Sequence, residues 1–180
     1  MLDNMHILGA SGTGTTTLGS AIAARYGHEH VDTDYYYWEP TDPPFQVKRE
    51  IPQRQQLLGS ALDAHPRWVL SGSLCGWGDI FVPQFQLVIY LYVPAEVRLA
   101  RLQERELQRY GKDALIPGGN MHETSEAFLE WAAGYEGESM EGRSKKLHER
   151  WLAELPCRYI RMEGTATVDE HLASLDGLFA

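Results

Sequence analysis

The chain has 180 residues, 43% of them hydrophobic and 23% charged, which is typical of a globular protein with a single domain. Its net charge of −9 argues against nonspecific binding to nucleic acid, and no segment is apolar enough to suggest a membrane span. The two cysteines suggest neither a metal site nor a disulfide framework, and there is no signal-peptide pattern, so we expect a cytoplasmic protein.

Strand and helix patterns alternate along the chain. The run LVIYLYV is apolar throughout, as expected for a strand buried on both faces of a parallel sheet. We expect strands at 5–8, 28–31, 67–72, 87–93 and 158–164, and helices at 16–26, 47–64, 95–109, 123–136, 139–154 and 167–178. Loops rich in proline and glycine are expected at 35–45 and 112–120. This alternation predicts an α/β fold with ligands bound beyond the carboxyl ends of parallel strands.

A glycine-rich segment, GASGTGTTTLG at residues 9–19, follows the first expected strand. It matches the phosphate-binding pattern G-x-x-x-x-G-K-[ST] except that Thr15 replaces the lysine. Backbone N–H groups and a helix N-terminus can bind phosphate here, and the Thr16 hydroxyl could ligate Mg²⁺. The predicted nucleotide-binding residues in this loop are Gly9, Ala10, Ser11, Gly12, Thr13, Gly14, Thr15, Thr16 and Thr17.

Two other interpretations of this loop remain open. A dinucleotide fingerprint G-x-G-x-x-G starting at Gly12 fails because its third glycine would be Thr17. Asp32 nevertheless ends the second strand, where a ribose-binding acid would lie, so an NAD(P)-dependent enzyme is a remote alternative. The third interpretation is an ordinary turn between a strand and a helix.

Four segments carry a resemblance to a known family: GASGTGTTTLGSAIA, VDTDYYYW, RWVLSGSLCGW and LVIYLYVPAEVRLARLQERE. The chain resembles the P-loop kinase family that includes adenylate kinase, shikimate kinase and gluconate kinase. It looks most similar to the branch described as adenylate-kinase-related or topology-modulation-like. This resemblance implies a three-layer P-loop NTPase fold in a single domain at 1–180, with a five-stranded parallel sheet in the order 2-3-1-4-5. It also implies an acceptor-binding region at 35–64 and a lid insert at 107–150.

The family also implies an activity, the Mg²⁺-dependent transfer of the ATP γ-phosphate to a small-molecule acceptor. Thr15 cannot supply the lysine charge, which is worth roughly 4 kcal/mol at 4 Å and an effective dielectric constant of about 20. The alternative is therefore a nucleotide-binding or regulatory protein with weak or no phosphotransfer. RMEGTATVDE, near the end of the chain, resembles the loop over the adenine in these kinases.

Arginines could replace the missing charge. Arg98, Arg101, Arg105 and Arg109 have helical spacing on one face, although they could instead form a solvated surface paired with neighbouring glutamates. The resemblance implies that Arg101 and Arg105 lie at the nucleotide and its phosphates, and that Arg143 lies on the far side of the lid. Lys48, Lys112, Lys145 and Lys146 are weaker candidates.

Acidic and aromatic residues follow the second strand. Resemblance to small-molecule kinases implies that Asp32 contacts the metal together with Thr16, and that Asp34 orients or deprotonates an acceptor hydroxyl. A helix cap is the plainer interpretation of these acids. The predicted catalytic residues are Asp34, Arg105 and Arg143, and the predicted acceptor-binding residues are Asp34, Trp38, Arg54 and Gly72. Ser71-Gly72 stands where adenylate kinases usually carry Asp-Gly, which weakens a nucleoside-monophosphate assignment.

Overall fold

The computed structural model describes residues 2–137 and 143–179. Its centre is a five-stranded sheet in the order β2-β3-β1-β4-β5, and every neighbouring pair is parallel. The strands are β1 (Asn4–Gly9), β2 (Glu29–Asp32), β3 (Trp68–Ser71), β4 (Leu87–Tyr92) and β5 (Arg158–Glu163). The predicted α/β class and strand order are therefore confirmed.

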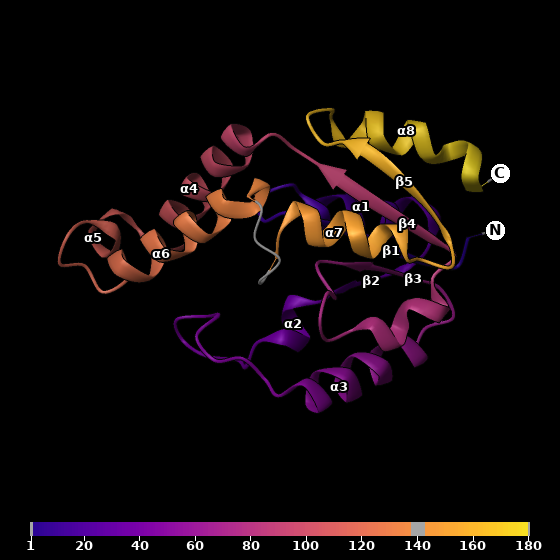
Figure 1. The fold of residues 1–180 in the computed structure, drawn as a ribbon, viewed down its shortest axis with the longest axis horizontal. Coiled ribbons are helices and arrows are strands. Elements are labelled where there is room, and N and C mark those ends of the chain that lie inside the picture. The colour runs from indigo at the N-terminus through magenta and orange to yellow at the C-terminus, as the bar shows by residue number, and fades with distance from the viewer. Residues whose placement is uncertain (1, 138–142, 180) are drawn as a thin grey trace.

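Helices connect the strands and cover both faces of the sheet (Figure 1). They are α1 (Thr15–Tyr26), α2 (Asp34–Tyr37), α3 (Ile51–Asp63), η1 (Asp79–Gln84), α4 (Ala95–Tyr110), α5 (Lys112–Leu115), α6 (His122–Ala133), η2 (Gly134–Glu136), α7 (Lys145–Ala153) and α8 (Val168–Phe179). None of the helices in the described residues is long and apolar enough to cross a membrane.

Two hydrophobic cores lie on opposite faces of the sheet. One packs the sheet against α1 and α8 through residues such as Ile22 and Leu172, and the other packs it against α3, η1 and α7 through residues such as Leu58 and Leu152. Alternate residues of β4 enter the two cores, with Ile89 in the first and Val88 in the second. This explains the uninterrupted apolar run of β4, because both of its faces are buried.

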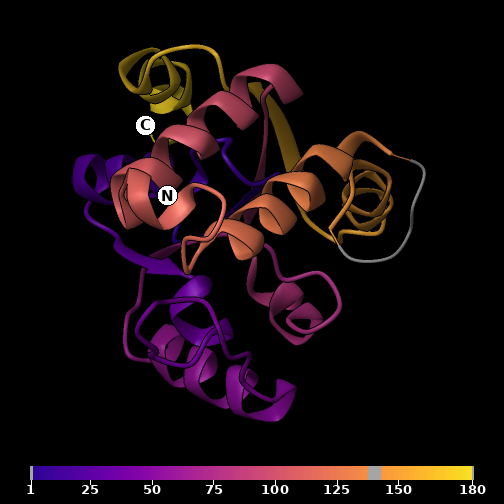
Figure 2. The same cartoon turned by 90° about the vertical axis from the view of Figure 1, so that its left-hand side faces the viewer.

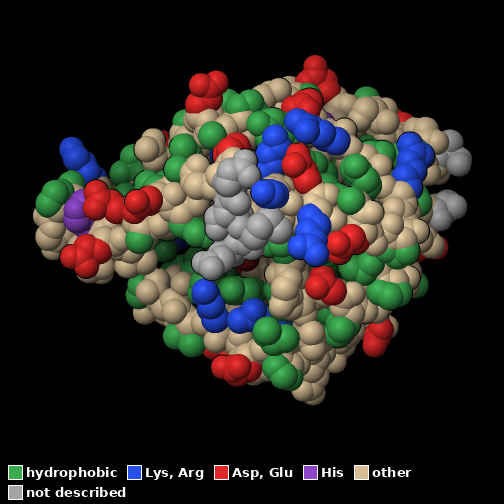
Figure 3. All heavy atoms as spheres, viewed as in Figure 1, with side chains coloured by type: hydrophobic (Ala, Val, Ile, Leu, Met, Phe, Trp, Pro, Cys, Tyr) green, Lys and Arg blue, Asp and Glu red, His purple; other side chains and the backbone are tan. Residues whose placement is uncertain are grey.

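Helices α4, α5 and α6 extend from the carboxyl end of β4 as an arm (Figures 1 and 2). The surface is hollowed between this arm and the body of the molecule (Figure 3). Helices α5 and α6 fall within the region expected as a lid at 107–150, whereas most of α4 precedes it, because α4 begins at Ala95.

Several expected element boundaries differ from the structure. Helix α3 begins at Ile51 rather than 47, with Pro52 in its first turn, where a missing N–H costs nothing. The helix expected at 139–154 begins at Lys145, and residues 139–142 lie outside the described part of the chain. The expected 35–45 loop contains part of the short helix α2, and Tyr36 and Tyr37 pack against the core beneath α3. The aromatic segment therefore belongs partly to the core, because its rings cover apolar surface at the edge of the sheet.

Candidate functional site

The glycine-rich loop connects β1 to α1 at the carboxyl edge of the sheet. Gly14 is the N-cap of α1 with a φ of 94°, a conformation that favours glycine, and no side chain caps the helix. The first hydrogen bond of the helix runs from the N–H of Leu18 to Gly14 O. The N–H groups of residues 15–17 therefore have no acceptor within the helix. Uncapped N–H groups at a helix N-terminus suit a phosphate, so the residues present fit the group that the loop pattern implies.

The loop is held in shape by its own residues and by α4. The backbone N–H of Thr13 donates to Ala10 O at 3.2 Å, and its hydroxyl donates to the same oxygen at 2.9 Å. Arg98 Nη1 donates to Ser11 O at 3.3 Å from a fully buried position. The carbonyl oxygens of Ala10 and Ser11 therefore accept hydrogen bonds from other residues of the protein.

Thr16 and Asp32 lie in direct contact beside the loop. The Thr16 hydroxyl donates to Asp32 Oδ2 at 2.7 Å, and Asp32 Oδ1 accepts from the backbone N–H of Asp34 at 3.0 Å. Asp32 thus stabilises the turn that leads into α2 and also contacts the start of α1. A hydroxyl and a carboxylate at this spacing are hard oxygen ligands of the kind Mg²⁺ takes, so these two residues could hold the ion directly or through water.

Asp34 lies in a strongly polar environment at the same edge. Loss of surrounding water and the charge of Asp32 raise the pKa of its carboxyl group, whereas Arg143, Arg105 and Arg109 lower it. Three arginines that are distant from Asp34 in the sequence thus oppose the rise in its pKa. A carboxylate with a raised pKa, next to a phosphate loop, is suited to accept a proton.

The predicted catalytic arginines approach the site from the arm and from the segment before α7. Arg143 Nη1 donates to the Ser11 hydroxyl at 3.3 Å, and its guanidinium lies 5.7 Å from the centre of the Trp131 ring. Arg105 lies 5.7 Å from the Phe128 ring centre, and its pKa is lowered by loss of water and by Arg109. The structure therefore places Arg143 at the loop, and Arg105 on the adjoining face of the arm.

The arginines of α4 are not equivalent. Arg98 is 0% exposed, donates to Val93 O and Ala132 O, and forms an ion pair with Glu136 at 2.7 Å. Arg101 is exposed and makes long contacts, at 3.4–3.5 Å, with the carbonyls of Gly12, Thr13 and Gly164. The four arginines that we expected on one face of this helix therefore differ in burial. Arg98 is buried and structural, whereas the other three are exposed.

The predicted acceptor residues come from α2, the residue that ends it, α3 and the turn after β3. The Arg54 guanidinium lies 3.9 Å from the Tyr37 ring centre, and its Nε donates to Arg49 O at 2.6 Å. Trp38 packs edge-on against Tyr37 and Phe45 inside the loop. Gly72 directly follows β3 with a φ of 112°, and a Cβ atom there would clash with Thr33, so glycine is required. The predicted acceptor residues therefore stay candidates, with Arg54 and Trp38 partly committed to packing.

A pocket of about 210 Å³ lies next to the glycine loop. It lies between the loop, Arg101 of α4 and the turn that follows β5. Its lining residues are Thr13, Gly14, Thr17, Leu18, Leu91, Arg101, Gly164, Ala166, Val168 and His171. The turn at Gly164 belongs to the segment expected over the adenine. Leu91 and His171 were not identified from the sequence, because a strand leucine and a helix histidine carry no local signal of a binding site.

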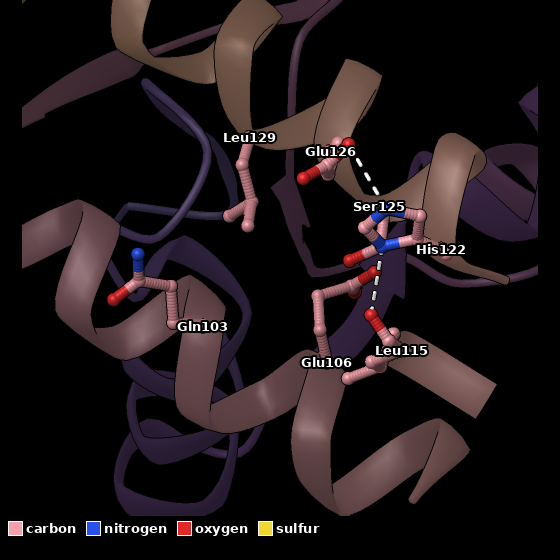
Figure 4. A pocket seen from close by; sticks show the side chains of 7 residues that line it. All are labelled: Gln103, Glu106, Leu115, His122, Ser125, Glu126 and Leu129. Atoms are coloured by element: carbon pink, nitrogen blue, oxygen red, sulfur yellow. Dashed lines mark hydrogen bonds and ion pairs between the residues drawn. The ribbon is translucent and has the colours of Figure 1, made fainter. Parts of the chain in front are cut away.

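A second pocket, of about 180 Å³, lies inside the arm (Figure 4). Glu106 of α4 and His122, Ser125 and Glu126 of α6 line it, and His122 Nδ1 donates to Leu115 O at 2.9 Å. The described residues hold no group of three or more His, Cys, Asp or Glu that could bind a metal ion. None of the residues that line this second pocket belongs to the glycine loop, so the pocket is separate from the candidate phosphate site.

Sequence reasoning also missed a buried polar network next to the site. His148 is 0% exposed; its Nδ1 lies 2.8 Å from the Tyr135 hydroxyl, which lies 3.0 Å from the Tyr90 hydroxyl. Its Nε2 lies 3.4 Å from the Ser73 hydroxyl. Burial, and then the charges of Arg143 and His6, lower the pKa of His148 to about 3, so it is neutral. His148 thus joins α7 to η2 and, through Tyr135, to Tyr90 of β4.

Comparisons with known proteins agree with this geometry. The family model described as AAA domain matches residues 6–127. The chain is 48% identical to protein YqaC of Bacillus subtilis (strain 168) over 96% of this chain and 94% of that protein. It is 30% identical to shikimate kinase 2 of Serratia proteamaculans (strain 568) over 76% of this chain and 80% of that protein.

Solved structures show the same fold at low identity. A shikimate kinase from Acinetobacter baumannii in complex with shikimate matches with a TM-score of 0.56 and 22% identity, over 97% of this chain and 90% of that one. A deoxyadenosine kinase from M. mycoides with bound dATP matches with a TM-score of 0.54 and 11% identity, over 97% and 98% of the two chains. The fold and the glycine loop are those of a P-loop kinase-like protein. The chain belongs to the AAA-domain family, among the P-loop nucleotide kinase-like proteins.

Proposed function

We propose that this protein is a Mg²⁺-dependent phosphotransferase that moves the γ-phosphate of ATP to a small-molecule acceptor. One observation carries the proposal: the Thr16–Asp32 contact at 2.7 Å joins the uncapped start of α1 to the acidic end of β2. Phosphate, metal and acceptor would then meet at one edge of the sheet.

Each part of the site has a role in this reaction. The loop at 9–17 holds the phosphates, and the pocket beside Arg101 holds the base. A bound Mg²⁺ ion would neutralise phosphate charge and would be held by Thr16 and Asp32. Asp34 orients the acceptor hydroxyl and takes its proton, while Arg105 and Arg143 balance charge on the transferred group.

The acceptor side favours a hydroxyl compound that also carries a planar or anionic group. Arg54, held against Tyr37, offers a fixed positive charge, and Trp38 offers a flat apolar surface. Shikimate and cytidylate are worth screening first, because relatives at about 30% identity are described as shikimate kinase and cytidylate kinase. Deoxynucleosides form the next group, since a structural neighbour is a deoxyadenosine kinase.

A nucleotide-binding protein with weak or no transfer is the second candidate, and Thr15 favours it. The NAD(P) alternative rested on Asp32 alone, and Asp32 is engaged by Thr16 on the phosphate side of the loop. This contact favours a metal-binding role for Asp32 over a ribose-binding one.

The test measures ATP and NAD binding by calorimetry with and without Mg²⁺, followed by acceptor screening for ADP release. We expect ATP binding that Mg²⁺ strengthens, and Asp32→Asn should lose about tenfold or more of that strengthening. Asp63→Asn, at the exposed end of α3, is the matched control and should behave as wild type. ATP binding without any acceptor-stimulated turnover would favour the binding protein, and no ATP binding at all would overturn both candidates.

A further inference from the structure

The glycine loop lacks a cation at the position where its pattern has lysine. Thr15 is the first residue of α1, and its side chain carries no charge. The backbone N–H groups of the loop can still bind phosphate, but they supply only partial charges. The terminal phosphate of a nucleoside triphosphate carries the most charge, so it is the group that this loop leaves least neutralised.

Most cations near the loop are committed elsewhere. Arg98 is fully buried, and its donors go to backbone carbonyls and to Glu136. Arg101 lies on the side of the base pocket and faces carbonyl oxygens. Lys145 pairs with Glu149 at 3.8 Å and lies 5.4 Å from the Tyr92 ring centre. None of these three contacts a side chain of the loop.

Arg143 is placed differently. Its Nη1 donates to the hydroxyl of Ser11, a partly buried side chain of the loop, at 3.3 Å. Its charge also lowers the pKa of Asp34. A guanidinium that contacts the loop and acts on the charge of the proposed acceptor base is suited to bind a phosphate transferred at this site.

Helix α7 holds Arg143 in this position. Arg143 directly precedes Ser144, the N-cap of α7, whose hydroxyl accepts from Leu147 N at 3.2 Å. The helix is anchored in turn by the 2.8 Å hydrogen bond between His148 and Tyr135. The backbone next to Arg143 therefore joins a capped and anchored helix, and the Arg143 side chain is placed by its contacts with Ser11 and Trp131.

We propose that Arg143 replaces the missing loop lysine, supplying from the start of α7 the positive charge that binds the terminal phosphate of a nucleoside triphosphate. This rests on the proposed function only in requiring that the loop binds such a nucleotide. In this inference, the positive charge that Thr15 lacks is supplied to the bound phosphate by Arg143.

The experiment compares binding of ADP and of a non-hydrolysable ATP analogue, each with Mg²⁺, by calorimetry. Wild type, Arg143→Met, Thr15→Lys and the double variant are measured. Arg143→Met should lower the preference for the triphosphate by about 10- to 100-fold, the value of a hydrogen bond to a charged group. Thr15→Lys should restore most of that preference in the double variant, which a merely structural role for Arg143 would not predict.

Two further variants keep the result interpretable. Arg150→Met, at an exposed position of the same helix that pairs with Glu154, should leave both affinities unchanged. Arg101→Met should weaken both nucleotides alike, because Arg101 lies on the base side. Circular dichroism and thermal unfolding confirm that each variant is folded.

The outcomes separate this inference from the proposed function. An unchanged triphosphate preference in Arg143→Met, or no restoration by Thr15→Lys, overturns the inference even where turnover is found. The expected loss and restoration without turnover on any acceptor would support the inference and contradict the transferase. A wild type that binds neither nucleotide overturns both.

Discussion

At the scale of single residues, Asp34 is the group whose protonation the proposed reaction depends on. Its pKa is raised by loss of water and by Asp32, and the nearby arginines oppose that rise. Only the ionised carboxylate can accept a proton from an acceptor hydroxyl. The balance between these charges therefore sets the pH at which the site becomes competent.

The first residue-scale prediction concerns the pH dependence of turnover. Because the pKa of Asp34 is raised, kcat/KM should rise with pH along an acid limb above the ordinary aspartate value of about 3.9. Arg105 favours the ionised form, so Arg105→Gln should move this limb to higher pH as well as slowing turnover. The measurement is kcat/KM against pH with the acceptor identified by screening.

Arg158→Gln is the control for this profile. Arg158 is exposed on β5, at the end opposite the carboxyl edge, and it should leave the limb in place. An acid limb that moves to lower pH in Arg105→Gln, or does not move, would contradict the electrostatic role given to Arg105.

At the scale of elements, α4 joins the arm to the glycine loop through Arg98. This side chain links the carbonyls of Ser11, Val93 and Ala132 with the carboxylate of Glu136. Its guanidinium also lies 5.1 Å from the Tyr135 ring centre. The end of β4, the loop and the base of the arm thus share one buried donor, so the position of the arm relative to the loop depends on it.

Replacing this donor should destabilise the protein strongly. Arg98→Met keeps much of the volume but leaves buried carbonyls without donors, so the free energy of unfolding should fall by about 2–4 kcal/mol. Arg101→Met, one turn along the same helix, removes only exposed contacts of 3.4–3.5 Å and should cost less than about 1 kcal/mol. Urea unfolding measures both values, and equal losses would show that Arg98 is not the structural link.

At the scale of the whole molecule, two fully buried histidines, His6 and His148, should contribute to the response to acid. Burial lowers the pKa of His6 to about 4, and burial together with Arg143 and His6 lowers that of His148 to about 3. His6 donates from Nδ1 to Leu70 O in the sheet, while His148 of α7 is hydrogen-bonded to Tyr135 of η2. Both are therefore neutral in the folded protein at pH values where an unfolded histidine is charged.

This difference predicts acid destabilisation that begins near neutral pH. Below pH 6.5 the unfolded chain binds protons at these histidines and the folded chain does not, so the folded state loses stability as pH falls toward 4. The slope contributed by each histidine is about 1.4 kcal/mol per pH unit. Urea unfolding between pH 7 and 4.5 measures it.

Substituting a histidine shows how much of the slope of the unfolding free energy against pH comes from that residue. His148→Gln should reduce the slope while keeping a polar side chain, whatever its effect on stability at pH 7. His65→Gln, at an exposed position after α3, should leave the slope unchanged. A slope that His148→Gln does not alter would mean that His148 is charged in the folded protein.

The sequence by itself determined the order of strands and helices, the parallel sheet and the place of the glycine loop. These depend on local signals: β4 is an uninterrupted apolar run, Gly14 directly precedes α1, and the acids end β2. The resemblance carried by these segments also gave the strand order, because related chains share the same crossovers. Local patterns of this kind persist regardless of what the rest of the chain packs against.

Only the tertiary structure decided what each arginine, histidine and aromatic residue does. Arg98 and Arg101 have the same chemistry and helical spacing, but Arg98 is enclosed by residues 34 or more positions away, at Ser11, Ala132 and Glu136. His148 is neutral because burial lowers its pKa, and Tyr36 and Tyr37 pack on the core because α3 folds back over them. Burial and charge pairing depend on contacts between distant segments, and no local pattern in the sequence encodes them.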